Sequence, residues 1–137
     1  MYEYKCKVTR VVDGDPCDVN VDLGFNLFTQ DRVRLMGIDT PESRTRNLAE
    51  KKLGLAAKAR LKELFKSQKS LILKTSKEGK GKFGRILGTI VIDDGRNVND
   101  ILCLEGHARP YHGGNKTNSP WVKDGKRWTS QGYVPFK

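Results

Sequence analysis

Two short acidic clusters stand out in this chain, although its surplus charge is positive. The stretch VVDGDPCDV places Asp13 and Asp15 on either side of one glycine, and MGIDTPES contains Asp39, Thr40 and Glu42. Carboxylates grouped in this way either form turns, since Asp-Gly and Asp-Thr-Pro are common turn sequences, or bind a hard cation. Each cluster alone is more typical of a turn. A metal site is favoured only if the fold brings the two clusters together.

The spacing of one hairpin predicts that the clusters meet. Strands are expected on both sides of turn residues centred at position 27, and antiparallel pairing about that centre places Asp15 opposite Asp39. Facing Cα atoms lie roughly 4.5–5.5 Å apart, so the two carboxylates repel unless one takes a proton or a cation lies between them. Ca²⁺ suits such oxygen donors. Thr40 offers a carbonyl or hydroxyl as a further ligand, and Glu42 is placed to orient a metal-bound water.

Two arginines extend this chemistry to phosphoryl transfer. Arg34 alternates with Val33 and Leu35, so it projects from the opposite face of a strand that leads to Asp39. Arg85 follows GKGKFG at the start of a later strand. Guanidinium groups and a metal ion stabilise the charge that develops on a reacting phosphate, while a carboxylate orients the attacking water. These residue types together predict hydrolysis of a phosphate ester.

The overall charge agrees with a polyanionic substrate. Lysine and arginine outnumber aspartate and glutamate by 26 to 16, which gives a net charge of +10. Such a surplus favours nucleic acid as a partner, although on charge alone an inert basic surface is an equal alternative. No apolar run approaches the ~20 residues of a membrane span, and MYEYKCKVTR is no secretory signal, so a cytoplasmic location without a membrane partner is expected. The three cysteines show no CxxC spacing and predict neither a disulfide framework nor a zinc site.

Hydrophobic periodicity predicts one domain over residues 1–137, of α+β class and mainly β. Alternating patterns indicate five short strands, near residues 4–9, 19–23, 32–38, 70–76 and 85–92. Helical spacing indicates helices over 48–66 and 97–106. This order suggests a five-stranded OB-fold-type barrel with two or three short helices. Residues 113–137 are predicted as an irregular C-terminal tail, partly held to the body by Trp121 and Trp128.

Four motifs carry a family resemblance. VVDGD, RVRLMGIDTPES, KGKFGRILG and VNDILCLEGHA, in this order, resemble the staphylococcal nuclease (thermonuclease) family, and particularly its small bacteriophage-encoded members. The resemblance extends over about residues 4–112. It implies an OB-fold barrel with added helices and Ca²⁺-dependent hydrolysis of DNA and RNA that breaks the P–O5′ bond and leaves 3′-phosphates. A monomer is expected, located in the host cell cytoplasm if the protein is phage-encoded.

The resemblance implies a metal site built from residues of both acidic clusters. Asp15 and Asp39 match the metal-ligating aspartates of the family, and Thr40 matches the residue that supplies a carbonyl ligand. Asp13 matches a nearby acid that supports the metal site. Pro16 departs from the family, which nearly always has threonine at that position. Because proline has no N–H and no hydroxyl, we expect weaker Ca²⁺ binding than in members with threonine.

The resemblance also implies roles at the scissile phosphate. Arg34 and Arg85 match the two catalytic arginines, and Glu42 matches the carboxylate that acts on the attacking water. Lys82 and Tyr111 match positions that contact the phosphate and the base of the nucleotide. The alternative function is a non-catalytic OB module that binds single-stranded nucleic acid. The complete set of acids and arginines favours the nuclease.

Overall fold

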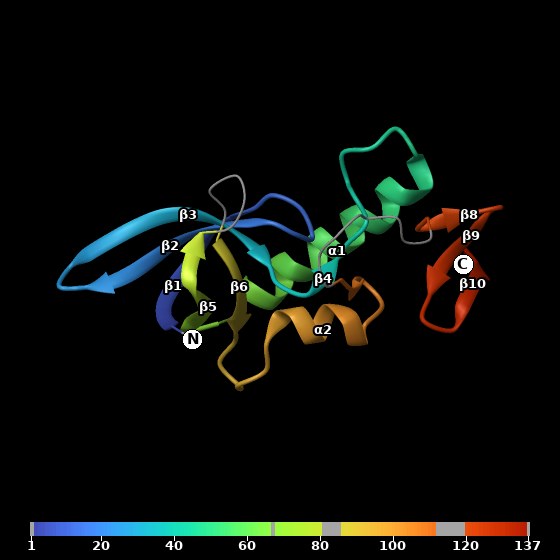
Figure 1. Cartoon of the computed structure of the whole chain (residues 1–137). Helices are drawn as coiled ribbons and strands as arrows, with labels where there is room; N and C mark the ends of the chain where they lie inside the picture. Colours follow the sequence, from blue (N-terminus) through green and yellow to red (C-terminus); the bar gives the residue numbers. More distant parts are fainter. Residues whose placement is uncertain (1, 67, 81–85, 112–119, 137) are drawn as a thin grey trace.

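The barrel that the sequence predicts is confirmed. A computed structural model describes residues 2–66, 68–80, 86–111 and 120–136, with the backbone alone described over 76–80. Within these residues a closed barrel has the strand order β1-β2-β3-β6-β5, in which β3 and β6 are parallel and the other neighbours antiparallel (Figure 1). Its strands are β1 (Tyr2–Val11), β2 (Cys17–Gly24), β3 (Leu27–Leu35), β5 (Leu71–Lys80) and β6 (Ile86–Val91). The fold is therefore α+β, mainly β and of OB type.

Helix α1 (Leu48–Lys66) covers the barrel over the range that periodicity predicts. It begins after Asn47, whose side-chain oxygen accepts the backbone N–H groups of Ala49 and Glu50, both at 3.1 Å. The apolar face of α1 packs into the core through Leu61 and Leu64. Neither this helix nor the second one in the described chain has the length and apolar character needed to cross a bilayer.

Helix α2 (Val98–Leu104) lies after the last barrel strand and is shorter than predicted. The side-chain oxygen of Asn97 caps its N-terminus by accepting the N–H of Asp100 at 2.7 Å. Gly106, with a φ of 80°, follows the C-terminal end, as a helix-terminating glycine should. The core itself is formed by alternate residues of the strands together with apolar residues of both helices. Its fully buried members include Val19, Val33, Leu35, Leu61, Leu73, Ile90 and Leu102.

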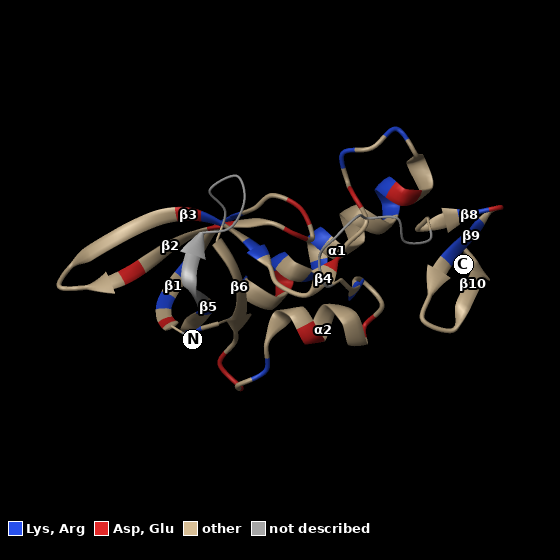
Figure 2. Cartoon of the chain, viewed as in Figure 1, with Lys and Arg blue, Asp and Glu red and all other residues tan. Residues whose placement is uncertain are grey.

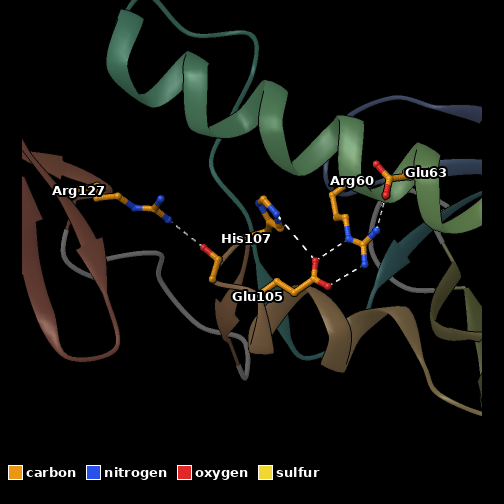
Figure 3. Close-up of polar contacts among 6 residues, drawn as sticks. Arg60, Glu63, Glu105, His107 and Arg127 are labelled. Atoms are coloured by element: carbon orange, nitrogen blue, oxygen red, sulfur yellow. Dashed lines mark hydrogen bonds and ion pairs between the residues drawn. The ribbon is translucent and has the colours of Figure 1, made fainter. Parts of the chain in front are cut away.

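Polar contacts join α1, α2 and the C-terminal part of the chain. Arg60 of α1 binds Glu105 at the end of α2 through two hydrogen bonds of 2.6 and 2.8 Å (Figure 3). The same guanidinium binds Glu63 at 2.7 Å and holds the pKa of Glu105 below its usual value. Arg127 donates to the carbonyl of Gly106 at 3.2 Å. Helix α2 is thus fastened on one side to α1 and on the other to the C-terminal segment.

The predicted irregular tail is wrong for residues 122–135. Strands β8 (Val122–Lys123), β9 (Lys126–Thr129) and β10 (Gly132–Pro135) form a small antiparallel sheet in the order β10-β9-β8. Asp124 and Gly125 connect β8 to β9 with φ values of 51° and 74°. Two positive φ values in a two-residue Asp-Gly loop are a strong hairpin signal. These strands have only two to four residues, and β8 and β9 contain lysine and arginine, so alternation of apolar residues does not reveal them.

Candidate functional site

A cavity of about 310 Å³ opens where the loop after β1 meets the segment that follows β3. It is lined by Asp13, Asp15, Pro16, Arg34, Asp39, Thr40, Glu42 and Arg44. The two acidic clusters and the first predicted arginine therefore lie around one space. Figure 2 shows acidic residues on the loop between β1 and β2, beside helix α1.

The hairpin register that predicted this meeting is wrong. Strand β2 pairs with β3 so that Cys17 faces Val33, which centres the hairpin at position 25 rather than 27. The turn is made by Phe25 and Asn26 with φ values of 54° and 61°, and β3 already begins at Leu27. Residues 29–31, which the sequence suggests are turn material, are therefore part of strand β3 in a long exposed hairpin.

Asp15 consequently lies beside Leu35 and not opposite Asp39. Its Oδ1 accepts the backbone N–H of Leu35 at 2.7 Å, and its Oδ2 lies 3.6 Å from Nε of Arg34. The Asp15 side chain is only 7% exposed. Pro16 follows Asp15 directly, and its carbonyl accepts hydrogen bonds from the N–H groups of Val12 and Asp13, both at 3.2 Å. The expected effect of Pro16 on cation binding stays a prediction.

Asp39 enters the cavity from a different element. The chain turns at Gly37 (φ 80°) into the short strand β4 (Ile38–Asp39), which pairs with β7 (Arg109–Pro110). The turn is held by Asn99 of α2, whose Nδ2 donates to the carbonyl of Met36 at 2.8 Å. The two aspartates thus line one cavity because β3 is followed by a turn and a second small sheet.

Close packing positions the loop that carries Glu42. A Cβ on Gly54 of α1 would lie 2.5 Å from the carbonyl carbon and oxygen of Glu42 and from the N of Ser43. Asp13 accepts the N–H of Ser43 at 3.2 Å through Oδ2 and the N–H of Gly14 at 3.0 Å through Oδ1. The loop after β4 therefore rests on the backbone of α1 and is tied to the loop after β1. Sequence analysis missed Gly54, although a glycine inside a strong helical pattern often marks such a close approach.

Gly14 makes a second close approach between the cavity loop and α1. A Cβ at this position would lie 2.9 Å from Cβ of Ala57 and 3.3 Å from Cβ and Oγ1 of Thr40. A larger residue would push the Asp13–Asp15 loop away from α1 and from Thr40. The glycine between the two aspartates therefore serves packing as well as the turn.

Arg34 has a guanidinium suited to receive an anionic group. Its Nη2 is buried and has no hydrogen-bond partner in the described part of the chain. A buried donor of this kind is costly unless a ligand or water accepts its hydrogen bond. The guanidinium carbon lies 5.7 Å from the ring centroid of Tyr111, whose N–H donates to the carbonyl of Gly37 at 2.8 Å. Arg34 and Tyr111 are thus neighbours, as expected if both contact one nucleotide. Arg85 and Lys82 lie outside the described residues.

The cavity combines oxygen donors with an excess of negative charge. Its lining side chains include four carboxylates and two guanidiniums, a formal excess of two negative charges that the guanidinium of Arg109 beside Asp39 partly offsets, in a chain whose net charge is +10. The donor set of carboxylates and a threonine fits a hard divalent cation such as Ca²⁺, which also accepts waters. Among the described residues, no group of three or more carboxylate, histidine or cysteine side chains already converges as a metal shell. Backbone and water oxygens would have to complete the coordination.

Arg109 is a neighbour of the site that sequence analysis missed. Its Nε lies 3.3 Å from Oδ2 of Asp39, and the two side chains are only 8% and 7% exposed. The guanidinium carbon lies 4.0 Å from the ring of Trp121 and 5.3 Å from the ring of Trp128. The two indoles pack edge to face with centroids 5.6 Å apart. The predicted anchoring of the tail by its tryptophans is confirmed, and the anchor is the arginine that holds Asp39. The two tryptophans in an otherwise polar tail were the feature of the sequence that could have indicated a cationic partner such as Arg109.

One known protein family matches a long, continuous part of this chain. The family described as staphylococcal nuclease homologue matches residues 32–128, which is most of the chain. The chain belongs to the staphylococcal nuclease family. The range matched by the family includes Arg34, Asp39 and Glu42, and it extends through the small sheet to Trp128.

Several of the similar proteins are named as nucleases. The SPbeta prophage-derived endonuclease YokF of Bacillus subtilis is 32% identical over 136 residues, covering 91% of this chain and 44% of the relative. The thermonuclease of Staphylococcus intermedius is 35% identical over 102 residues, covering 74% of this chain and 56% of that protein. Endonuclease YncB of Bacillus subtilis is 33% identical, covering 73% and 44%. The chain spans about half the length of these three relatives.

Proposed function

We propose that this chain is a Ca²⁺-dependent nuclease that hydrolyses DNA and RNA to products with 3′-phosphates. One observation carries the proposal. A single cavity holds a formal excess of two negative charges together with a buried guanidinium N–H that has no described partner. The first feature suits a divalent cation and the second suits a phosphate oxygen. The endonuclease and thermonuclease relatives give independent support.

In this proposal the carboxylates of Asp15 and Asp39 and the carbonyl of Thr40 hold the Ca²⁺. When bound, the ion supplies Lewis-acid polarisation of a phosphate oxygen. Asp13 fixes the backbone next to Glu42 through its hydrogen bond to the Ser43 N–H. The acid predicted to support the metal site thus acts on the loop that carries Glu42.

Glu42 and the arginines act at the scissile phosphate. Glu42 orients a water and accepts its proton as the water oxygen bonds to phosphorus. The P–O5′ bond breaks, the 5′-oxygen leaves as a hydroxyl after taking a proton from solvent, and the phosphate stays on the 3′ side. Arg34 donates to the non-bridging oxygens as their charge grows. We assign the same role to Arg85 and contacts with the phosphate and base to Lys82 and Tyr111.

The proposal is tested by cation removal. Single-stranded DNA should be cut with Ca²⁺ present and left intact when the ion is chelated. The carboxylates of Asp15 and Asp39 repel a phosphate unless a bound cation compensates their charge. Products should become primers for a polymerase only after phosphatase treatment, which reports 3′-phosphate ends. Cleavage that persists in chelator would refute the cation requirement. Tight binding without cleavage at any Ca²⁺ concentration would identify the non-catalytic single-strand-binding module instead.

Replacing Glu42 with glutamine separates its role from that of the ligands. Glu42→Gln keeps the shape but loses the basic oxygen, so kcat should fall by about 10²–10⁴-fold, the usual contribution of a general base. Ca²⁺ affinity, measured by calorimetry without substrate, should change much less than in Asp15→Ala. An equal loss of affinity in the two variants would make Glu42 an ordinary ligand.

A further inference from the structure

A second cavity lies on the barrel between strand β1 and helix α1. Its volume is about 460 Å³, and it shares no lining residue with the acidic cavity. The lining residues are Val8, Thr9, Arg10, Val11, Lys58, Lys62, Phe65 and Lys66. We call this feature the β1–α1 groove. It combines four cationic side chains with an apolar floor and includes no carboxylate.

The basic side chains of the β1–α1 groove form no close ion pair with the carboxylates that the structure describes. In the described chain, none of its four basic side chains takes part in an ion pair. Two acids close to them in the sheet or the sequence form hydrogen bonds with other arginines. Asp18 faces Arg10 across the β1–β2 ladder, but its carboxylate binds Arg32 at 2.8 and 3.3 Å. Glu63 on α1 binds Arg60.

The three lysines form a row along one side of α1. Lys58, Lys62 and Lys66 recur every four residues, which places each about 6 Å further along the helix axis. Like charges at this spacing repel one another and weaken a helix slightly. The row therefore has a small unfavourable effect on the helix, which an anion with several charges lying against it would remove. A nucleic acid strand presents phosphates in series.

The β1–α1 groove begins next to the proposed active site. Val11 ends β1 two residues before Asp13, and Lys58 directly follows Ala57, which packs against Gly14. The two cavities are therefore lined by residues that neighbour one another in β1 and its following loop and along α1, and α1 lies beside the acidic loop in Figure 2.

We propose that the β1–α1 groove binds the backbone of the single-stranded nucleic acid substrate beyond the bond that is cleaved. The lysines and Arg10 contact successive phosphates. Phe65, which is partly exposed in the floor, supplies an apolar surface for a base or sugar, as aromatic residues do in single-strand-binding grooves. The identity of the strand as a substrate rests on the proposed function, but binding to the groove does not require cleavage.

Charge-neutralising variants with a matched control test the proposal. The groove variant is Lys58→Gln/Lys62→Gln/Lys66→Gln, and the control is Lys69→Gln/Lys123→Gln/Lys126→Gln, whose three lysines are exposed and lie outside the groove. Binding of a fluorescent 30-nucleotide single strand is followed by anisotropy over a range of salt concentrations in chelator, so that no strand is cut. Three lost phosphate contacts should reduce the slope of log K against log salt by about 2 in the groove variant. The control should retain most of the slope.

The possible outcomes distinguish failure of the groove proposal from failure of the nuclease proposal. Replacement of the same three lysines by arginine should keep the slope, and it provides a folded comparison if the glutamine variant is unstable. Equal slopes for the groove variant and the control would overturn the groove, since net charge alone would then explain binding. Binding of anionic lipid vesicles that depends on these lysines, without any effect on DNA binding, would overturn it too. If the natural protein never cuts DNA with Ca²⁺ but the two slopes differ, the nuclease fails and the groove stands.

Discussion

Replacing Arg34 with lysine should lower kcat for DNA cleavage by about 10²–10³-fold, the usual loss when one preorganised donor to transition-state charge is removed. Lysine keeps the positive charge but cannot present two parallel N–H groups to a phosphate. The expectation follows from the position of Arg34, which lines the acidic cavity with a buried Nη2 that has no described acceptor. The measurement is single-turnover cleavage of an oligonucleotide at saturating Ca²⁺.

Arg32→Lys provides the matched control on the same strand. Arg32 binds Asp18 on the barrel surface, its side chain is 43% exposed, and it does not line the cavity. Its replacement by lysine should leave kcat unchanged and alter the free energy of unfolding by no more than about 1 kcal/mol, as for other exposed pairs. If Arg34→Lys cleaves as fast as Arg32→Lys, Arg34 has no part in the chemistry.

The barrel was predictable because its core follows local periodicity. Val19 and Val21 alternate with polar residues along β2, and each is buried as alternation requires. The C-terminal sheet was not predictable in this way. Its strands have only two to four residues. Trp121 and Trp128 hold this sheet against Arg109, which precedes the sheet in the sequence by more than ten residues. Contacts of this kind leave no periodic pattern.

Residues of the site were easier to predict than the way in which the fold assembles them. Residue type and motif indicated Asp15 and Asp39, and both line the same cavity. The proposed pairing across a hairpin was wrong because register depends on which turn residues adopt positive φ. Here those residues include Phe25, which rarely does so. Asp39 instead depends on β7, and the importance of Arg109 comes from tertiary pairing that no local motif shows.

Replacing Arg109 with methionine should lower the free energy of unfolding by about 3–5 kcal/mol, the usual cost of removing one partner from a buried ion pair. Asp39 then keeps its place in the interior with less compensating positive charge, and both tryptophans lose the cation over their rings. Because Asp39 is a proposed Ca²⁺ ligand, the small C-terminal sheet would support the proposed active site through this arginine. Urea unfolding measures the loss.

Two further variants decide whether the pair itself is responsible. In Arg109→Met/Asp39→Asn the buried charge is gone, so the double variant should unfold at a higher urea concentration than Arg109→Met alone, although it has two substitutions. Arg96→Met is the surface control, since Arg96 and its partner Asp94 are 65% and 49% exposed, and its cost should not exceed about 1 kcal/mol. A loss in Arg109→Met no larger than that in Arg96→Met would show that Asp39 does not depend on Arg109. A double variant less stable than Arg109→Met would assign the loss to the tryptophan contacts instead.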